Sequence, residues 1–157
     1  MNTAHLIKLY TIYFVLTVVL LGAVTFALTT FFDLELGGSL GIITMILPAM
    51  LVGQRYAKRW EARPANGYAW RITGIFTAIN FALGVIVGAL VVSFTVGWQE
   101  VSEIIGGIPL SYAVGIGVVL FLVYWAAGRF FFGFGAKTQL KSMAEQAARA
   151  QDGSNQR

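Results

Sequence analysis

The side chains that could do chemistry in this chain are few and widely separated. There is one histidine, His5, and no cysteine, so a catalytic triad, a thiolate zinc site and a disulfide framework all lack their residues. No Walker loop or Rossmann pattern occurs, because Gly115-x-Gly117 lacks a third glycine and a preceding strand. We therefore predict no catalytic, cofactor-binding or metal site, no cofactor and no enzymatic activity.

Four residues within otherwise apolar stretches indicate helix packing. Gly84 and Gly88 form a GxxxG pair, whose small face lets another helix approach closely, within the chain or between copies. Asn80 lies one turn before Gly84, and an asparagine in hydrocarbon usually bonds across helices, contributing on the order of 0.6 kcal/mol. Pro48 removes a backbone donor and predicts a kink. An alternative interpretation makes Pro48 a hinge or pore lining and Asn80 a substrate contact.

A basic and aromatic segment is the most distinctive polar part of the chain, and its cations form a predicted cytoplasmic patch: Arg55, Lys58, Arg59, Arg63 and Arg71. One interpretation is a docking surface for anionic lipid, a soluble partner or nucleic acid. The other is the ordinary anchor that keeps a loop on the cytoplasmic side of a membrane. We favour the anchor and expect no nucleic-acid partner. Attraction to anionic lipid of about 1 kcal/mol per basic residue follows in either case.

Composition indicates that the apolar segments of this chain are surrounded by lipid. Hydrophobic residues make up 57% of the 157 residues and charged residues only 11%, whereas soluble domains carry about 25% charged residues. A transmembrane helix needs about 20 apolar residues. Four runs lack any charged side chain and are about that long: Leu9 to Phe32, Leu36 to Gln54, Ile72 to Gln99 and Ile104 to Gly128.

The distribution of charge predicts how these runs are threaded. All 11 basic residues precede the first run, lie between the second and third, or end or follow the fourth. The other two connections contain only acidic residues, namely Asp33, Glu35, Glu100 and Glu103. Because basic residues near span ends stay in the cytoplasm, we predict four spans with both termini cytoplasmic.

The predicted fold is an all-α polytopic membrane protein, a four-helix transmembrane bundle made of two helical hairpins. The transmembrane domain covers residues 1–136, with spans at about 9–32, 37–54, 72–97 and 108–128. Residues 137–157 are predicted to form a cytoplasmic amphipathic helix and a tail that is disordered from Asp152. The helix of the second span is expected to continue into the cytoplasm, because its basic residues recur at helical spacing.

The stretch Gly53-Gln-Arg-Tyr-Ala-Lys-Arg59, followed by Arg63-Pro64 and Trp70-Arg71, resembles a family of small bacterial four-span inner-membrane proteins whose function is not characterised. The resemblance covers under half of the chain. It implies a bacterial cytoplasmic membrane and four spans, and it brings no activity or functional residues with it.

Two functions remain after these exclusions. The first is a non-enzymatic membrane protein that acts through helix and protein contacts, as a homo-oligomer or as an assembly or regulatory subunit of a complex. Its expected partners are the bilayer, anionic lipids at the cytoplasmic face, and a second copy or another protein. The alternative is a channel or small-solute transporter, which Pro48, Asn80 and the membrane threonines would serve.

Overall fold

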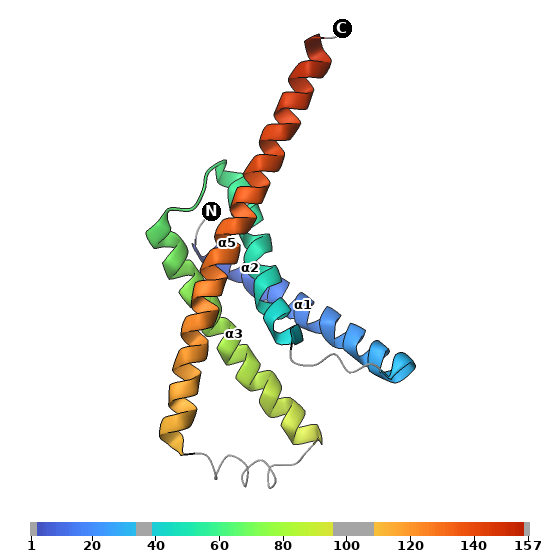
Figure 1. Ribbon diagram of the computed structural model, residues 1–157, viewed down its shortest axis with the longest axis vertical. Coiled ribbons are helices and arrows are strands. Elements are labelled where there is room, and N and C mark those ends of the chain that lie inside the picture. The colour runs from blue at the N-terminus through green and yellow to red at the C-terminus, as the bar shows by residue number, and fades with distance from the viewer. Residues whose placement is uncertain (1–2, 34–38, 96–108, 156–157) are drawn as a thin grey trace.

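The structure is a computed structural model that describes residues 3–33, 39–95 and 109–155. These residues form the helices α1 (Thr3–Phe32), α2 (Ser39–Trp60), α3 (Asn66–Thr95) and α5 (Leu110–Asn155) and no strand (Figure 1). The all-α prediction is therefore confirmed over the described part of the chain. The predicted turns at residues 34–38 and 96–108 lie outside it.

Among the described residues, three helices are long and apolar enough to cross a membrane: Thr3–Phe32, Asn66–Leu90 and Leu110–Asp152. The protein is thus helical with three candidate membrane spans. Helix α2 is not among them; its 22 residues include Pro48, and its last turn carries Lys58 and Arg59. The fourth span stays a prediction.

The helices are longer than the predicted spans. Helix α2 continues beyond Gln54 to Trp60, as expected, and α3 already begins at Asn66 rather than at Ile72. Helix α5 runs without interruption to Asn155, so the expected boundary after residue 136 lies within a continuous helix. Residues 152–155 are helical where we expected disorder. These residues have low helix propensity of their own, and they continue the helix of the alanine-rich segment that precedes them.

Two acidic residues end helices in the left-handed conformation. Asp33, directly after α1, has φ 54°, and Glu61, directly after α2, has φ 49°. The Glu61 N–H donates to the Ala57 carbonyl at 2.8 Å, which satisfies one of the last free carbonyls of α2. Glycine usually takes this position, since a side chain there costs roughly 1–2 kcal/mol.

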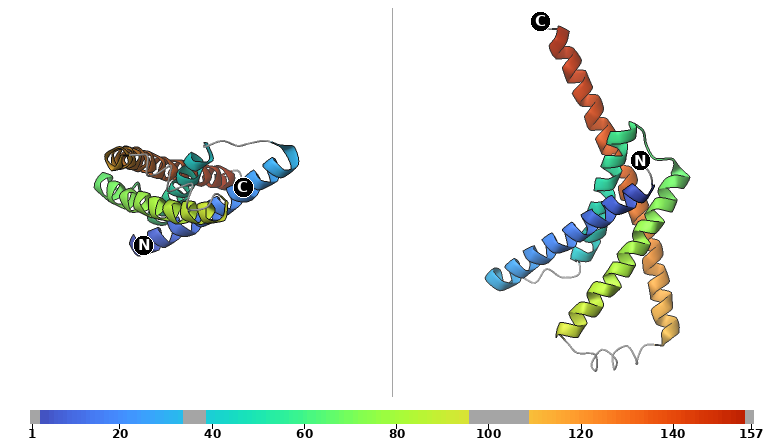
Figure 2. Two further views of the ribbon diagram at one scale, coloured as in Figure 1. Left: turned by 90° about the horizontal axis from the view of Figure 1, so that it is seen from below. Right: turned by 180° about the vertical axis from the view of Figure 1, so that it is seen from behind.

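The four helices meet at one end and separate towards the other (Figures 1 and 2). Helix α2 packs most extensively against α5, while α3 contacts α5 and α1 contacts α2. The buried core lies where the helices meet and comprises Leu6, Tyr10, Phe14, Ala49, Val52, Ala69, Ile72, Phe76 and Phe132. A bundle-like core therefore exists at one end only, and the distant halves of α1, α3 and α5 diverge.

Aromatic rings connect the four described helices in this core. The Tyr10 and Phe76 rings stack with centroids 4.0 Å apart and an interplanar angle of 1°. Phe76 also meets Phe132 edge-on at 6.1 Å, and Tyr56 meets Phe132 at 6.0 Å. Such pairs each contribute about 0.5–1.5 kcal/mol beyond their buried area. The rings thereby hold α1 and α3 against α5.

Glycines set the closest approach between α2 and α5. A Cβ atom added at Gly53 would collide with the backbone carbonyl of Phe132, and one added at Gly135 would collide with that of Met50. Both glycines are buried. The two backbones touch directly because neither position carries a side chain.

Candidate functional site

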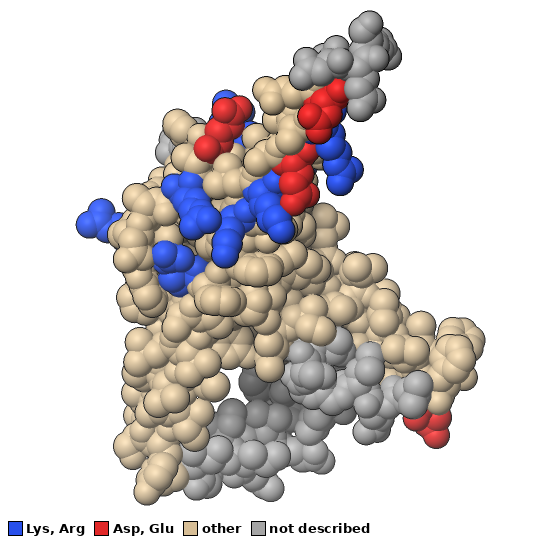
Figure 3. Space-filling view, turned by 45° about the horizontal axis from the view of Figure 1, so that its top comes forward, with Lys and Arg blue, Asp and Glu red and all other residues tan. Residues whose placement is uncertain are grey.

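Basic side chains gather where the helices meet, and Figure 3 shows them around one part of the surface while much of the remaining surface is uncharged. We call this surface the basic end and define it by the cations that line its hollows: Arg55, Lys58, Arg59, Arg63, Arg129 and Lys137. The first three come from the last turns of α2, Arg63 follows α2, and the last two come from α5. The tertiary fold thus brings together cations that are far apart in the sequence.

Two adjoining hollows occupy one part of the basic end. The first, about 410 Å³, is lined by His5 and Leu9 of α1 and by Arg55, Lys58 and Arg59. The second, about 330 Å³, shares two of these cations and is lined by Tyr13, Leu51, Gln54, Arg55, Lys58 and Gln139. The predicted clustering of Arg55, Lys58 and Arg59 is present. Arg55 Nε also donates to the Tyr13 hydroxyl at 3.2 Å, which connects α2 to α1.

A third hollow, which we call the Arg129 cleft, has a volume of about 500 Å³ and is lined by Arg63, Pro64, Arg129, Phe130, Gly133, Phe134 and Lys137. Arg129 Nη2 donates to Asn66 Oδ1 at 2.8 Å, which ties α5 to the first residue of α3. Its Nε is buried and has no hydrogen-bond partner among the described residues. Arg63 of the predicted patch belongs to this cleft, whereas Arg71 is exposed and lines none of the three hollows.

Tyr56 lies next to the predicted basic patch and contacts several rings. Its ring is 5.9 Å from that of Tyr68 and 6.4 Å from that of Trp60. Burial, followed by the charge of Tyr68, raises the pKa of Tyr56 above its ordinary value. The Tyr56 hydroxyl is therefore harder to ionise than a tyrosine in water.

Asn80 lies in a cavity between the helices. The cavity measures about 420 Å³ and is lined by residues of all four helices, among them Phe14, Thr44, Asn80, Gly84 and Tyr124. The Asn80 side chain interacts with Tyr10 of α1. Its Nδ2 is nonetheless buried without a hydrogen-bond partner among the described residues.

The other predicted packing residues differ in burial. Pro48 is buried inside α2, which continues through it. Gly84 and Gly88 are exposed, and a Cβ added at either would meet no described atom within 4 Å. The GxxxG face therefore packs closely against no described helix of this chain, although Gly84 lines the Asn80 cavity. Its use between copies stays a prediction.

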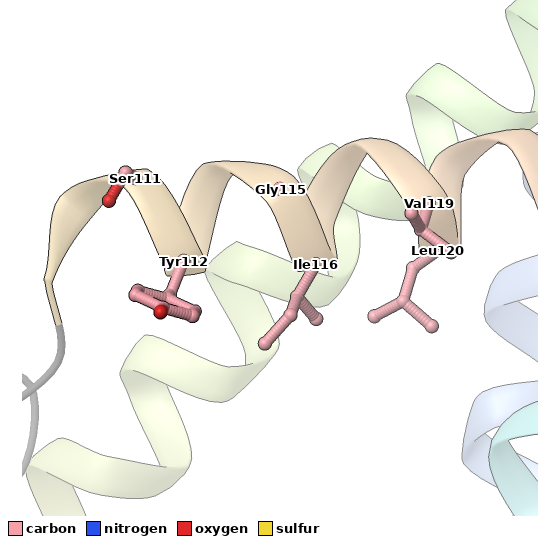
Figure 4. A pocket seen from close by; sticks show the side chains of 6 residues that line it. All are labelled: Ser111, Tyr112, Gly115, Ile116, Val119 and Leu120. Carbon is pink, nitrogen blue, oxygen red and sulfur yellow. The ribbon is translucent and has the colours of Figure 1, made fainter.

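The largest of these hollows, about 610 Å³, lies along the distant half of α5. Tyr112, Ile116 and Leu120 project from one face of the helix, with Gly115 beside them (Figure 4). All of its described lining residues come from α5, so it is an uncovered helix face.

Sequence reasoning missed Gly53, Gly133 and Gly135 as close-packing positions. At Gly133, a Cβ would stand 2.8 Å from Arg129 Nη1, so this glycine makes room for the guanidinium along α5. The sequence contained one signal for these positions. The segment from Gly128 to Gly135 holds three glycines and four phenylalanines. Small residues among large ones at a span end indicate a crossing point.

Comparisons with family models, with curated proteins and with solved structures find no match to this chain.

Proposed function

We propose that this chain is a four-span integral protein of a bacterial cytoplasmic membrane, with both termini in the cytoplasm. It has no catalytic activity and acts through contacts with a second copy or with another membrane protein. The concentration of basic residues at one end of the structure supports this orientation, because basic residues near span ends stay cytoplasmic. Helix α2 is the fourth span, and its direct backbone contact with α5 supports its place beside a transmembrane helix.

The observation that carries this proposal is the extent of apolar surface left uncovered where the helices diverge. Leu20 of α1 is 61% exposed, Val85 of α3 is 71% exposed, and Ile116 of α5 is 59% exposed. Helices that separate in this way leave room for lipid or for another protein between them. The exposed small face of Gly84 and Gly88 is suited to a second helix, because only small residues permit such close packing.

Substitution of the GxxxG face tests this proposal. Gly84→Leu with Gly88→Leu should abolish close packing against a second helix and shift the purified protein to a smaller assembly. Native mass spectrometry and cross-linking in membranes measure the assembly and recover any partner. Gly22→Leu and Gly115→Leu are matched controls, because both glycines are equally exposed in spans but have no glycine four residues away.

If assembly size and partner recovery are unchanged in the double variant, contact through this face is wrong. If the controls disturb assembly as strongly as the double variant does, the effect comes from added bulk in the spans rather than from the GxxxG face.

The Asn80 cavity favours a second candidate, a channel or small-solute carrier. Its polar amide has an unpaired donor inside mostly apolar walls, an arrangement suited to a small polar solute. Purified protein in liposomes should then conduct ions or take up solute, and Asn80→Leu should reduce the rate. Liposomes without conductance or uptake would remove this candidate.

A further inference from the structure

The Arg129 cleft combines three cations with an aromatic wall. Arg63 enters from the segment after α2, and Arg129 and Lys137 lie about two turns apart on α5. Phe130 and Phe134 contribute the aromatic part of the lining. None of the three cations has an ion-pair partner among the described residues, where the one ion pair joins Lys141 to Glu145 at 3.7 Å. Three uncompensated positive charges in one hollow complement an anion with several oxygen acceptors.

Arg129 is held ready for such an anion. Its Nη2 is fixed by Asn66 Oδ1 at 2.8 Å, and its Nη1 lies over Gly133, where no side chain competes for the space. Its buried Nε has no hydrogen-bond partner among the described residues. A guanidinium that is already oriented loses less entropy when it binds phosphate oxygens, and its planar donors match them.

The position of the cleft along α5 indicates the source of the anion. Roughly 20 residues separate Leu110 from Arg129, which corresponds to ~30 Å of helix, the thickness of the hydrocarbon layer. Arg129 therefore stands at the level of the lipid headgroups. Phe130 and Phe134 are 64% and 48% exposed, and their rings stack 6.3 Å apart with an interplanar angle of 14°. These rings offer an apolar surface directly beside the cations.

We propose that the Arg129 cleft binds the phosphate of an anionic glycerophospholipid. Arg63, Arg129 and Lys137 contact the headgroup, and Phe130 and Phe134 contact the glycerol and the first acyl carbons. The site rests on the proposed membrane placement and goes beyond it, because general attraction to an anionic surface requires no particular geometry. A free phosphate ion would use the cations but would gain nothing from the exposed rings.

The test measures lipid retention by native mass spectrometry on the full-length protein in gentle detergent. Phosphatidylglycerol is titrated against phosphatidylcholine, which carries a phosphate but no net charge. The unaltered protein should retain phosphatidylglycerol selectively. Arg129→Gln should weaken its retention about tenfold, the usual effect of losing a charge-assisted hydrogen bond.

Gly133→Ala separates a built site from general attraction. The added methyl group must displace the Arg129 guanidinium, which is the flexible end of a side chain, and the net charge does not change. We expect several-fold weaker retention of phosphatidylglycerol with an unchanged melting temperature. The matched control is Arg149→Gln, since Arg149 is an exposed cation of α5 that does not line the cleft. Retention in this control should fall no more than about fivefold, the limit of general attraction.

Three results would overturn the proposal. One is unchanged retention in Gly133→Ala, and another is an equal loss in Arg149→Gln and Arg129→Gln. The third is displacement of phosphatidylglycerol by inorganic phosphate beyond that caused by sodium chloride of equal ionic strength, which would identify free phosphate as the ligand. The same spectra count protein copies, so a change in assembly without a change in lipid retention concerns the proposed function and leaves the site intact.

Discussion

Direct contact between two backbones makes Gly53 and Gly135 the most constrained positions of the described chain. At each, an added Cβ meets a carbonyl group rather than the movable end of a side chain. The backbone of one helix must therefore shift, and this shift would disturb the packing of Phe132 and Ala136, which are both fully buried. The contact between α2 and α5 depends on the absence of two side chains.

Gly53→Ala should therefore destabilise the protein strongly for the addition of one methyl group. Overpacking usually lowers the free energy of unfolding by about 1–3 kcal/mol. Because the added methyl group meets backbone here, we expect a loss of about 3 kcal/mol, which corresponds to a fall of roughly 10 °C in Tm. Thermal unfolding in detergent measures the effect. Gly22→Ala is the control, because nothing described lies within 4 Å of its added Cβ and alanine favours helix. Equal melting temperatures for the two variants would show that the backbones do not touch.

At the residue scale, the sequence indicated that glycines would allow close helix packing, but it did not indicate which glycines pack against which helix. The GxxxG pattern drew attention to Gly84 and Gly88, yet α2 and α5 meet at Gly53 and Gly135. Within a single helix, a pair four residues apart defines a small face, whereas one glycine on each of two helices forms no pattern along the chain. A crossing of that second kind becomes recognisable only when the helices are placed side by side.

At the scale of elements, α5 joins a candidate membrane span and a charged segment in one continuous helix. Its first part is apolar, its middle packs against α2 through Phe132, Gly135 and Ala136, and its last turns carry exposed charges. The sequence predicted both helical parts. It did not predict their continuity, since the change in composition near Lys137 resembles a boundary between elements. A change in composition indicates a change in the surroundings of a segment. It does not indicate the end of a helix, because the helix backbone can continue from one environment into another.

A proline scan of α5 should separate these parts. Ala144→Pro removes one helix hydrogen bond beyond the packed region and should reduce helix content while leaving Tm within about 2 °C. Ala136→Pro makes the same change at a fully buried site against Gly53, at a cost of about 3 kcal/mol or more, and should prevent stable packing. Circular dichroism and thermal unfolding measure both variants. A large fall in Tm for Ala144→Pro would mean that the outer part of α5 supports the core.

At the scale of the whole molecule, the distribution of charge follows the arrangement of the helices. The cations gather where the helices meet, and the uncovered apolar surface lies where they part. The uneven distribution of charge along the sequence predicted that the cations would share one side. The divergence of the helices was not predictable, because an apolar helix face looks the same whether it packs against protein or lipid.

The cysteine-free sequence allows a direct test of the proposed threading. Asp33→Cys, directly after α1, should react with a membrane-impermeant maleimide in intact cells. Ala65→Cys, next to the basic end, should react only after the membrane is opened. Both residues are exposed, so a difference in labelling reports the side of the membrane. Labelling of Ala65→Cys in intact cells would reverse the orientation, and equal labelling of both would contradict four spans.

The uninterrupted course of α5 has a mechanical consequence. Beyond its contact with Gly53, the helix continues for roughly 20 residues, or ~30 Å, without a described hinge. A tilt of the diverging half of α5 by 10° about that contact would sweep the opposite tip through about 5 Å. Because the helix extends about equally far on both sides of the glycine contact, a movement of the diverging half would be transmitted to the other end of α5 with nearly the same amplitude.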